Sequence, residues 1–278
     1  MKRPLSWLLA GLAALGWYSW RVEPRWLRIK HLTLIVPGLP RAFDSYRIGH
    51  LSDLHLGVRL IQEHLPLVVQ AINREQPDLL AITGDFATGQ RDGLTTARDV
   101  LAAFHAPDGV WATLGNHDYH VGVDRVMALL DAAGINVLCN AHHTITRGPD
   151  QLVLAGVDDV IYGVADLNAT LYRVNHGSPV VLLAHEPDYA RIAVADPRIM
   201  LQLSGHTHGG QIRVPGLRPL ILPKLGHLYP AGSFQIGHLA LFVTTGTGTG
   251  RFVLRFNCRP EIAIITLRCG PIHTEKSL

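Results

Sequence analysis

The sequence predicts an α/β protein in which two facing mixed β-sheets are flanked by helices. Two observations lead to this fold class. In the first half of the chain, short apolar runs alternate with longer amphipathic segments, which is typical of strands joined by helices in a largely parallel, covered sheet. In the second half, further short apolar runs follow with fewer helical intervals, and a second sheet facing the first accommodates them.

The individual elements follow from these patterns in chain order. Residues 61–72 carry apolar side chains at 3.6-residue spacing on one stripe, which predicts an amphipathic helix. We expect two further helices at residues 96–104 and 123–130. The expected strands follow the apolar segment at residues 32–36 and lie at residues 47–51, 78–82, 110–114, 151–157, 180–184, 200–203, 239–243 and 261–267.

The stretch from residue 211 to residue 237 is rich in glycine, proline and apolar residues. Prolines at positions 215, 219, 223 and 230 exclude long regular structure, so we expect an ordered loop. Two roles are open for its leucines and isoleucine. They receive the acyl chains of an amphiphilic substrate, or they pack against the sheet as part of the core.

The composition narrows the class of protein and of partner. Apolar residues make up 47% of the 278 residues and charged residues 17%, so part of the apolar excess needs a location. The net charge of +3 is compatible with anionic substrates or lipid headgroups, but it is too small to indicate nucleic acid as a partner. The three cysteines are too few and too widely spaced for a disulfide scaffold.

The N-terminus has the pattern of a membrane segment. Lys2 and Arg3 precede an uncharged run at residues 4–20, which as a helix would be about 25 Å long against a hydrocarbon core of about 30 Å. Tryptophans gather around this run and basic residues follow it, as at a membrane interface. We expect an uncleaved transmembrane or signal-anchor helix. A signal peptide cleaved near Ala14-Leu15-Gly16 and a buried N-terminal helix are the alternatives.

This segment sets the expected domain organisation. Residues 1–30 form a membrane anchor and linker, and residues 31–278 form one catalytic domain, because neither a repeat nor a second domain boundary interrupts the rest. The distribution of basic residues around the anchor weakly favours the cytoplasmic side for the catalytic domain. The sequence does not indicate an oligomeric state.

Polar motifs stand at the ends of five expected strands. Because ligands bind beyond the carboxyl ends of strands in α/β sheets, we expect these motifs to meet in one crevice. Two carboxylates, an amide oxygen and several imidazoles suit divalent transition metals rather than structural zinc. Seven ligands divide between two ions about 4 Å apart that share one carboxylate. The expected metal ligands are Asp53, His55, Asp85, Asn116, His185, His206 and His208.

The five motifs, in this order, resemble those of the calcineurin-like metallophosphoesterases over residues 45–267. The chain also resembles the small membrane-associated branch of YkuE-type phosphodiesterases, through Glu23-Pro24 and the segments at residues 206–211 and 257–261. The resemblance implies a four-layer sandwich and two divalent ions, with Mn²⁺ as the first choice and Fe, Zn, Ni and Co as alternatives.

The resemblance also implies a role for each motif residue. Asp53, His55 and His208 would bind the first ion, and Asp85 would bridge the two. Asn116, His185 and His206 would complete the second site, which leaves the catalytic residue His117 for proton transfer. We expect Asp118 to orient His117 or to cap a turn. The glycines at residues 246–250 form a strand connection, since the lysine and hydroxyl of a P-loop are missing.

These features predict a metal-dependent hydrolase of phosphate esters or pyrophosphates at the membrane. The anchor, the mild basic charge and the apolar loop favour an amphiphilic phosphate compound or lipid over other small molecules. By resemblance, UDP-2,3-diacylglucosamine of the lipid A pathway is the first specific substrate, and a general phosphodiesterase of the cell envelope is the alternative. A metal-binding interaction scaffold without catalysis is the competing class.

Overall fold

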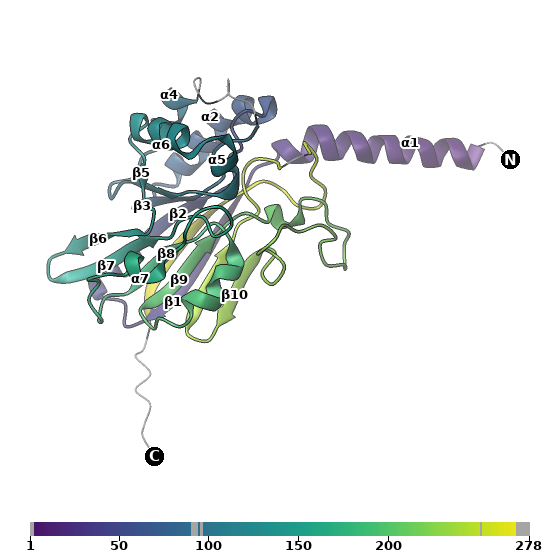
Figure 1. The fold of residues 1–278 in the computed structure, drawn as a ribbon. Coiled ribbons are helices and arrows are strands. Elements are labelled where there is room, and N and C mark those ends of the chain that lie inside the picture. The colour runs from purple at the N-terminus through teal and green to yellow at the C-terminus, as the bar shows by residue number, and fades with distance from the viewer. Residues whose placement is uncertain (1–2, 90–93, 95–96, 251, 271–278) are drawn as a thin grey trace, which may run out of the picture.

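The computed structural model describes residues 3–89, 94, 97–250 and 252–270. Two six-stranded mixed sheets face each other, and helices cover their outer faces (Figure 1). One buried apolar layer lies between the sheets, and one more lies between each sheet and the helices that cover it. The predicted fold class is therefore confirmed.

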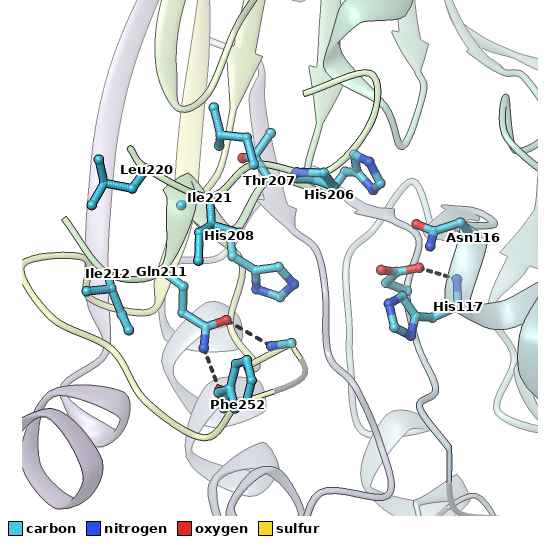
Figure 2. A pocket seen from close by; sticks show the side chains of 15 residues that line it. Asn116, His117, His206, Thr207, His208, Gln211, Ile212, Leu220, Ile221 and Phe252 are labelled. Atoms are coloured by element: carbon cyan, nitrogen blue, oxygen red, sulfur yellow. Dashed lines mark hydrogen bonds between the residues drawn. The ribbon is translucent and has the colours of Figure 1, made fainter. Parts of the chain in front are cut away.

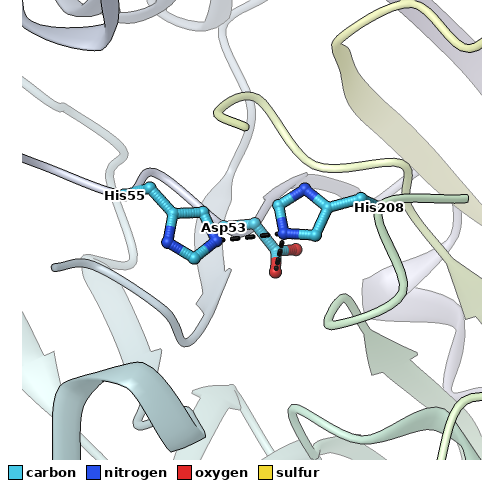
Figure 3. A group of neighbouring side chains, drawn as sticks. All are labelled: Asp53, His55 and His208. Carbon is cyan, nitrogen blue, oxygen red and sulfur yellow. Dashed lines mark hydrogen bonds and ion pairs between the residues drawn. The ribbon is translucent and has the colours of Figure 1, made fainter. Parts of the chain in front are cut away.

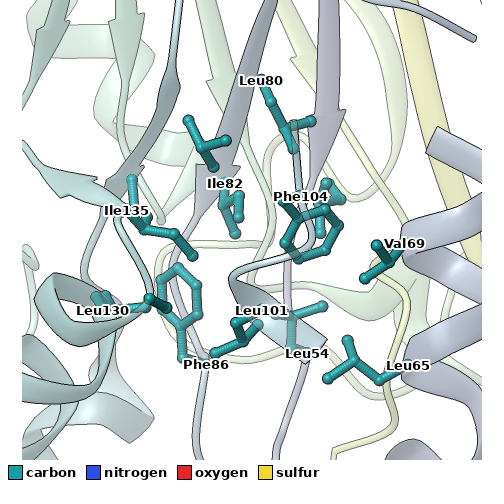
Figure 4. Close-up of a cluster of buried hydrophobic side chains, with 14 of the residues drawn as sticks. Leu54, Leu65, Val69, Leu80, Ile82, Phe86, Leu101, Phe104, Leu130 and Ile135 are labelled. Carbon is teal, nitrogen blue, oxygen red and sulfur yellow. The ribbon is translucent and has the colours of Figure 1, made fainter. Parts of the chain in front are cut away.

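The first sheet has the strand order β1-β12-β2-β3-β4-β5. All neighbours are parallel except β12 and β2. Its outer face packs on helices through a cluster that includes Leu65, Leu80 and Leu130 (Figure 4). The strands are β1 (Arg28–Pro37), β2 (Arg47–Leu51), β3 (Leu79–Thr83), β4 (Val110–Thr113), β5 (Asn136–Val137) and β12 (Glu261–Gly270), and the helices are α2 (Arg59–Arg74), α4 (Arg98–Leu101), α5 (Asn116–Val121) and α6 (Val123–Ala132).

The second sheet has the order β10-β11-β9-β8-β7-β6, with antiparallel strands only at its two edges. Short helices cover its outer face. The strands are β6 (Ala141–Arg147), β7 (Asp150–Gly156), β8 (Val180–Leu183), β9 (Ile199–Ser204), β10 (Gly232–Ile236) and β11 (Leu239–Val243), and the helices are α7 (Leu167–Thr170) and α8 (Ala190–Ala193).

Three strands that lack a continuous apolar run were not predicted from the sequence. β5, β6 and β10 lie at or near sheet edges and are half-exposed, and β10 falls inside the stretch at residues 211–237 that was expected to be a loop. The loop prediction is therefore wrong for residues 232–236. The helix expected at residues 96–104 is present only as α4, and Thr96 lies outside the described residues.

Helix α1 (Arg3–Trp17) projects from the body of the protein (Figure 1). Its residues from Ser6 to Trp17 are all exposed, so the alternative of a buried N-terminal helix is wrong. Among the described residues, none of the helices combines the length and the apolar character needed to cross a membrane. The chain continues through helical turns at Tyr18–Val22 and Glu23–Arg25 directly into β1, which runs across residue 30.

Candidate metal centre

The seven expected ligands lie at the carboxyl ends of the parallel strands β2, β3, β4, β8 and β9. Six of them, all but Asn116, together with His117 form three overlapping groups in which potential ligand atoms lie within 4.8 Å of one another. Asp85 belongs to two of these groups and His55 to two. The groups are Asp53, His55 and His208 (Figure 3), then His55, Asp85 and His117, then Asp85, His185 and His206.

The backbone at these positions is unusual. Five of the seven residues have the left-handed conformation, which is uncommon outside glycine and gathers at functional sites. Close backbone approach also requires glycine here. A Cβ on Gly205 would collide with Ser52 and Asp53, and one on Gly115 would collide with Asp85. The five left-handed residues are Asp53 (φ 56°), His55 (49°), Asp85 (55°), His206 (70°) and His208 (50°).

Two of the imidazoles are held by backbone carbonyls. His185 Nδ1 donates to the Thr83 carbonyl at 2.6 Å, and its buried Nε2 has no hydrogen-bond partner and lies 3.3 Å from Asp85 Oδ2. His206 Nε2 donates to the Lys224 carbonyl at 2.8 Å. In a neutral imidazole, a carbonyl that accepts from one ring nitrogen fixes the tautomer and leaves the other nitrogen free to bind a metal.

The cluster of Asp53, His55 and His208 also brings potential ligand atoms close together. The Nε2 atoms of His55 and His208 lie 3.0 Å apart, and His208 Nε2 lies 3.5 Å from Asp53 Oδ1. Asn116 Oδ1 is buried without a hydrogen-bond partner. Buried polar atoms without partners are costly, and a cation between them satisfies several at once. The donor set therefore fits divalent metal ions.

Burial keeps most of these imidazoles neutral. Loss of hydration lowers the pKa of His55 to about 3 and that of His206 to about 4, and it lowers the pKa of His208 well below its ordinary value. For His185, burial also lowers the pKa, but the nearby Asp85 carboxylate outweighs it and raises the pKa well above the ordinary value. Protons therefore compete little for three of the four imidazoles at neutral pH.

Asp118 braces the site rather than orienting His117. Its carboxylate accepts hydrogen bonds from the backbone amides of Asp85, Ala87 and Gly115, at 3.0, 3.1 and 2.9 Å. Of the two roles expected for Asp118, the cap of a turn is the one observed. The half-buried ring of His117 lies edge-on to that of His55, with 4.8 Å between ring centroids, and its Nδ1 is 3.4 Å from Thr88 Oγ1.

Two buried charged residues support the cluster of Asp53, His55 and His208: Arg255, which the sequence patterns did not single out, and Glu23, which they singled out only through the resemblance and without a role in the site. The Arg255 guanidinium donates to the carbonyls of Thr245, Gly246, Gly248 and Cys258. Gly248 in turn donates its amide to the Asp53 carbonyl at 2.8 Å. The carboxylate of Glu23 accepts from the Cys258 amide, and Cys258 Sγ donates to the His208 carbonyl at 3.1 Å. The burial of these two charged side chains is the feature that marks them as part of the site, and it can be recognised only in the folded structure.

The metal centre opens into a pocket of about 460 Å³. Figure 2 shows Asn116 and His117 on one side, and Ile212, Leu220, Ile221 and Phe252 on the other. Leu220 and Ile221 are exposed, as are Leu217 and Leu228. Of the two roles left open for the apolar loop, packing as core is therefore wrong for these four residues.

The family described as calcineurin-like phosphoesterase matches residues 46–210, which is more than half of the chain. The chain belongs to this family and is a metallophosphoesterase, and members typically bind two divalent metal ions.

Relatives extend the similarity over almost the whole chain. It is 35% identical over 277 residues to an uncharacterized metallophosphoesterase, YkuE, of Bacillus subtilis, and 96% of both chains is covered. It is 30% identical over 259 residues to the phosphodiesterase YaeI of Escherichia coli, with 90% of this chain and 92% of the relative covered. It is 33% identical over 256 residues to a transmembrane protein with metallophosphoesterase domain of Danio rerio, of which it spans 57%.

Proposed function

We propose that the chain hydrolyses a phosphate ester or pyrophosphate with two divalent ions held by the seven expected ligands. The observation that carries this proposal is the position of Asp85 between the two sets of ligands: its Oδ2 lies 3.7 Å from His55 Nε2, which also groups with Asp53 and His208, and 3.3 Å from His185 Nε2. One carboxylate common to two sites is the arrangement of a dinuclear centre. Asp53, His55 and His208 would hold the first ion, and Asn116, His185 and His206 would hold the second, with Asp85 between them.

The protein residues have separate tasks in this proposal. Bound ions supply a water activated near neutral pH and offset the negative charge of the phosphoryl group. Asn116 offers a neutral oxygen and so adds no charge that would repel an anionic substrate. His117 is placed by a hydrogen bond of 2.9 Å from its backbone amide to Asp85 Oδ1, and its ring borders the pocket. We assign His117 the protonation of the leaving group.

The proposed substrate is an amphiphilic phosphodiester or pyrophosphate. The apolar side of the pocket supports this class, because it offers hydrocarbon contacts next to the metal ligands. UDP-2,3-diacylglucosamine is the first specific candidate. A general phosphodiesterase of the cell envelope is the alternative, and the name of the relative YaeI favours phosphodiester chemistry in general.

Residues 1–30 are proposed to anchor a catalytic domain of residues 31–278 to the cell membrane, with the domain on the cytoplasmic side. The exposed apolar surface of α1 and the relatives that are named transmembrane proteins support the membrane location. Mn²⁺ is the proposed metal, with Fe, Zn, Ni and Co as alternatives, because the oxygen and nitrogen donor set suits ions of this type.

Turnover of bis-p-nitrophenyl phosphate tests the enzymatic proposal. The full chain, stripped of metal and then supplied with Mn²⁺, should hydrolyse this ester, and the metal-free chain should not. A folded chain that binds Mn²⁺ without turning over this or any other phosphodiester would favour the interaction scaffold. A screen of phospholipids and nucleotide sugars then ranks the substrate classes.

A further inference from the structure

The rim of the pocket on the side away from His117 is apolar and exposed. We use the term rim for Ile212, Leu220, Ile221 and Phe252, which are 44%, 76%, 80% and 61% exposed. They come from two segments that are held together, because the Gln211 side chain donates to the carbonyls of Phe252 and Leu254. Contiguous exposed apolar side chains around a pocket indicate an interaction surface.

Helix α1 leaves the protein beside this rim. The Arg255 amide donates to the Ser19 carbonyl at 2.9 Å, so the base of the helix is tied to the segment that carries Phe252. Val253 and Trp20 line one groove together. In Figure 1 the helix and the loops that follow β9 project on the same side of the molecule. A helix that is apolar all round, and exposed from Ser6 to Trp17, requires an apolar environment.

The loop that carries Leu220 and Ile221 is basic. Residues 211–237 contain Arg213, Arg218 and Lys224 and no acidic residue, although the Asp188 carboxylate accepts a hydrogen bond from the Leu228 amide at the far end of the loop. Arg218 and Lys224 are exposed on the loop at residues 211–231 that carries Leu220 and Ile221. Arg21 is exposed at the base of α1, where Glu63 lines the same groove and contributes an opposing charge. Apolar side chains interspersed with basic ones match the interface of an anionic bilayer, where headgroups attract the cations and the acyl boundary takes up the apolar groups.

We propose that the rim and α1 form one membrane-binding face, so that the metal pocket opens directly onto the headgroup layer of an anionic bilayer. The pocket then receives its substrate from the lipid surface. The delivery of substrate from the lipid surface rests on the proposed function, whereas the binding of this face to the membrane does not. The helix alone would leave the orientation of the body free, and the rim fixes it as a second point of contact.

Quenching of a fluorophore by spin-labelled lipid tests the contact directly. The full chain carries a single reactive thiol through Ile221→Cys, with Cys139→Ser and Cys269→Ser as background, since Cys258 is buried. Ile35→Cys in the same background is the matched control, because Ile35 is 64% exposed but lies towards the end of β1 away from α1. In vesicles of phosphatidylcholine and phosphatidylglycerol, the label at position 221 should be quenched and the label at position 35 should not.

The charge contribution has its own measurement. Arg218→Gln in the Ile221→Cys background should weaken quenching in these vesicles, because one basic side chain at an anionic surface changes partitioning roughly fivefold. The same substitution should have no effect in pure phosphatidylcholine. Equal quenching with and without Arg218 in anionic vesicles would overturn the assignment of an anionic partner.

Two results would overturn the docking face. One is a label at position 221 that remains unquenched while the protein sediments with the vesicles. The other is a label that becomes shielded as protein concentration rises without lipid, which would identify a second copy of the chain as the occupant. Hydrolysis of bis-p-nitrophenyl phosphate in the same samples reports the proposed function separately. Loss of hydrolysis with retained quenching therefore contradicts only the function.

Discussion

The two sides of the pocket differ in how they are held. The metal side consists of buried side chains on strained backbone, braced by Asp118, Arg255 and Glu23. The apolar side consists of exposed side chains such as Leu220 and Ile221. Chemistry that depends on ligand positions needs the rigid side. Recognition of a hydrocarbon chain needs a large apolar contact area and tolerates variation in side-chain position, so the exposed side suits substrate selection.

The largest effect is expected from Asp85→Asn, because the Asp85 carboxylate lies next to both His55 and His185, which are expected ligands of different ions. Turnover should be abolished, and bound metal should fall from two ions towards one or none. Metal analysis of the purified variant, together with its melting temperature, measures this. Two tightly bound ions with normal turnover in the variant would remove Asp85 from the bridge position.

His117→Asn tests the catalytic residue on the metal side. Metal binding should persist, while kcat should fall by about 10²–10⁴-fold, which is typical of a lost general acid. The loss should be greatest for esters with poor leaving groups, because these depend most on proton donation. Equal losses for good and poor leaving groups would argue against the acid role.

Glu23→Gln tests whether the N-terminal segment supports the first cluster. The variant weakens the hydrogen bond to the Cys258 amide, and Cys258 contacts the His208 carbonyl. Loss of such support typically lowers metal affinity about 10–100-fold. Glu75→Gln is the matched control, because Glu75 pairs with His31 and Arg47 rather than with any ligand segment. Equal metal affinities in the two variants would show that the support is not needed.

Acid should destabilise the metal-free protein through His50 as well as through the ligands. Burial lowers the pKa of His50 to about 3, from an ordinary value of about 6.5. As the pH falls, His50 therefore becomes protonated in the unfolded chain before it does in the folded chain. The stability associated with neutral His50 is complete above pH 6.5 and declines towards pH 3, by at most about 1.4 kcal/mol per pH unit. Urea unfolding of the metal-free wild type and His50→Gln should show a shallower pH dependence for the variant.

The smallest effect on the fold is expected on the apolar side. Replacing Leu220, Ile221 and Leu222 with Ser should barely change the melting temperature, because the first two are exposed. It should raise KM for a diacylated substrate about tenfold, corresponding to about 1.4 kcal/mol of lost apolar contact. KM for a small soluble ester should not change. Unchanged KM for both substrates would eliminate acyl binding, and a large fall in melting temperature would indicate core packing.

The sequence predicted the metal side better than the apolar side. Motifs at strand ends, such as Asp53-Leu54-His55, combine local residue chemistry with a general rule of sheet geometry. Arg255 acts across the fold, and no local pattern distinguishes it from a surface charge; the Glu23-Pro24 motif marked Glu23 but not its contact with Cys258. Likewise, composition cannot separate exposed Ile221 from a core residue, because burial depends on what packs against it. The edge strands β6 and β10 were missed for a related reason: half-exposed strands lack a continuous apolar run.

A Mn²⁺ titration of the metal-free full chain tests the dinuclear assignment most directly. Bound ions per chain and turnover of bis-p-nitrophenyl phosphate are measured on the same samples at each metal concentration. We predict saturation at two ions, with turnover appearing only as the second ion binds, because Asp85 lies between His55 and His185, which are expected ligands of different ions. Full turnover with one ion per chain, or two bound ions without turnover, would contradict a dinuclear phosphoesterase.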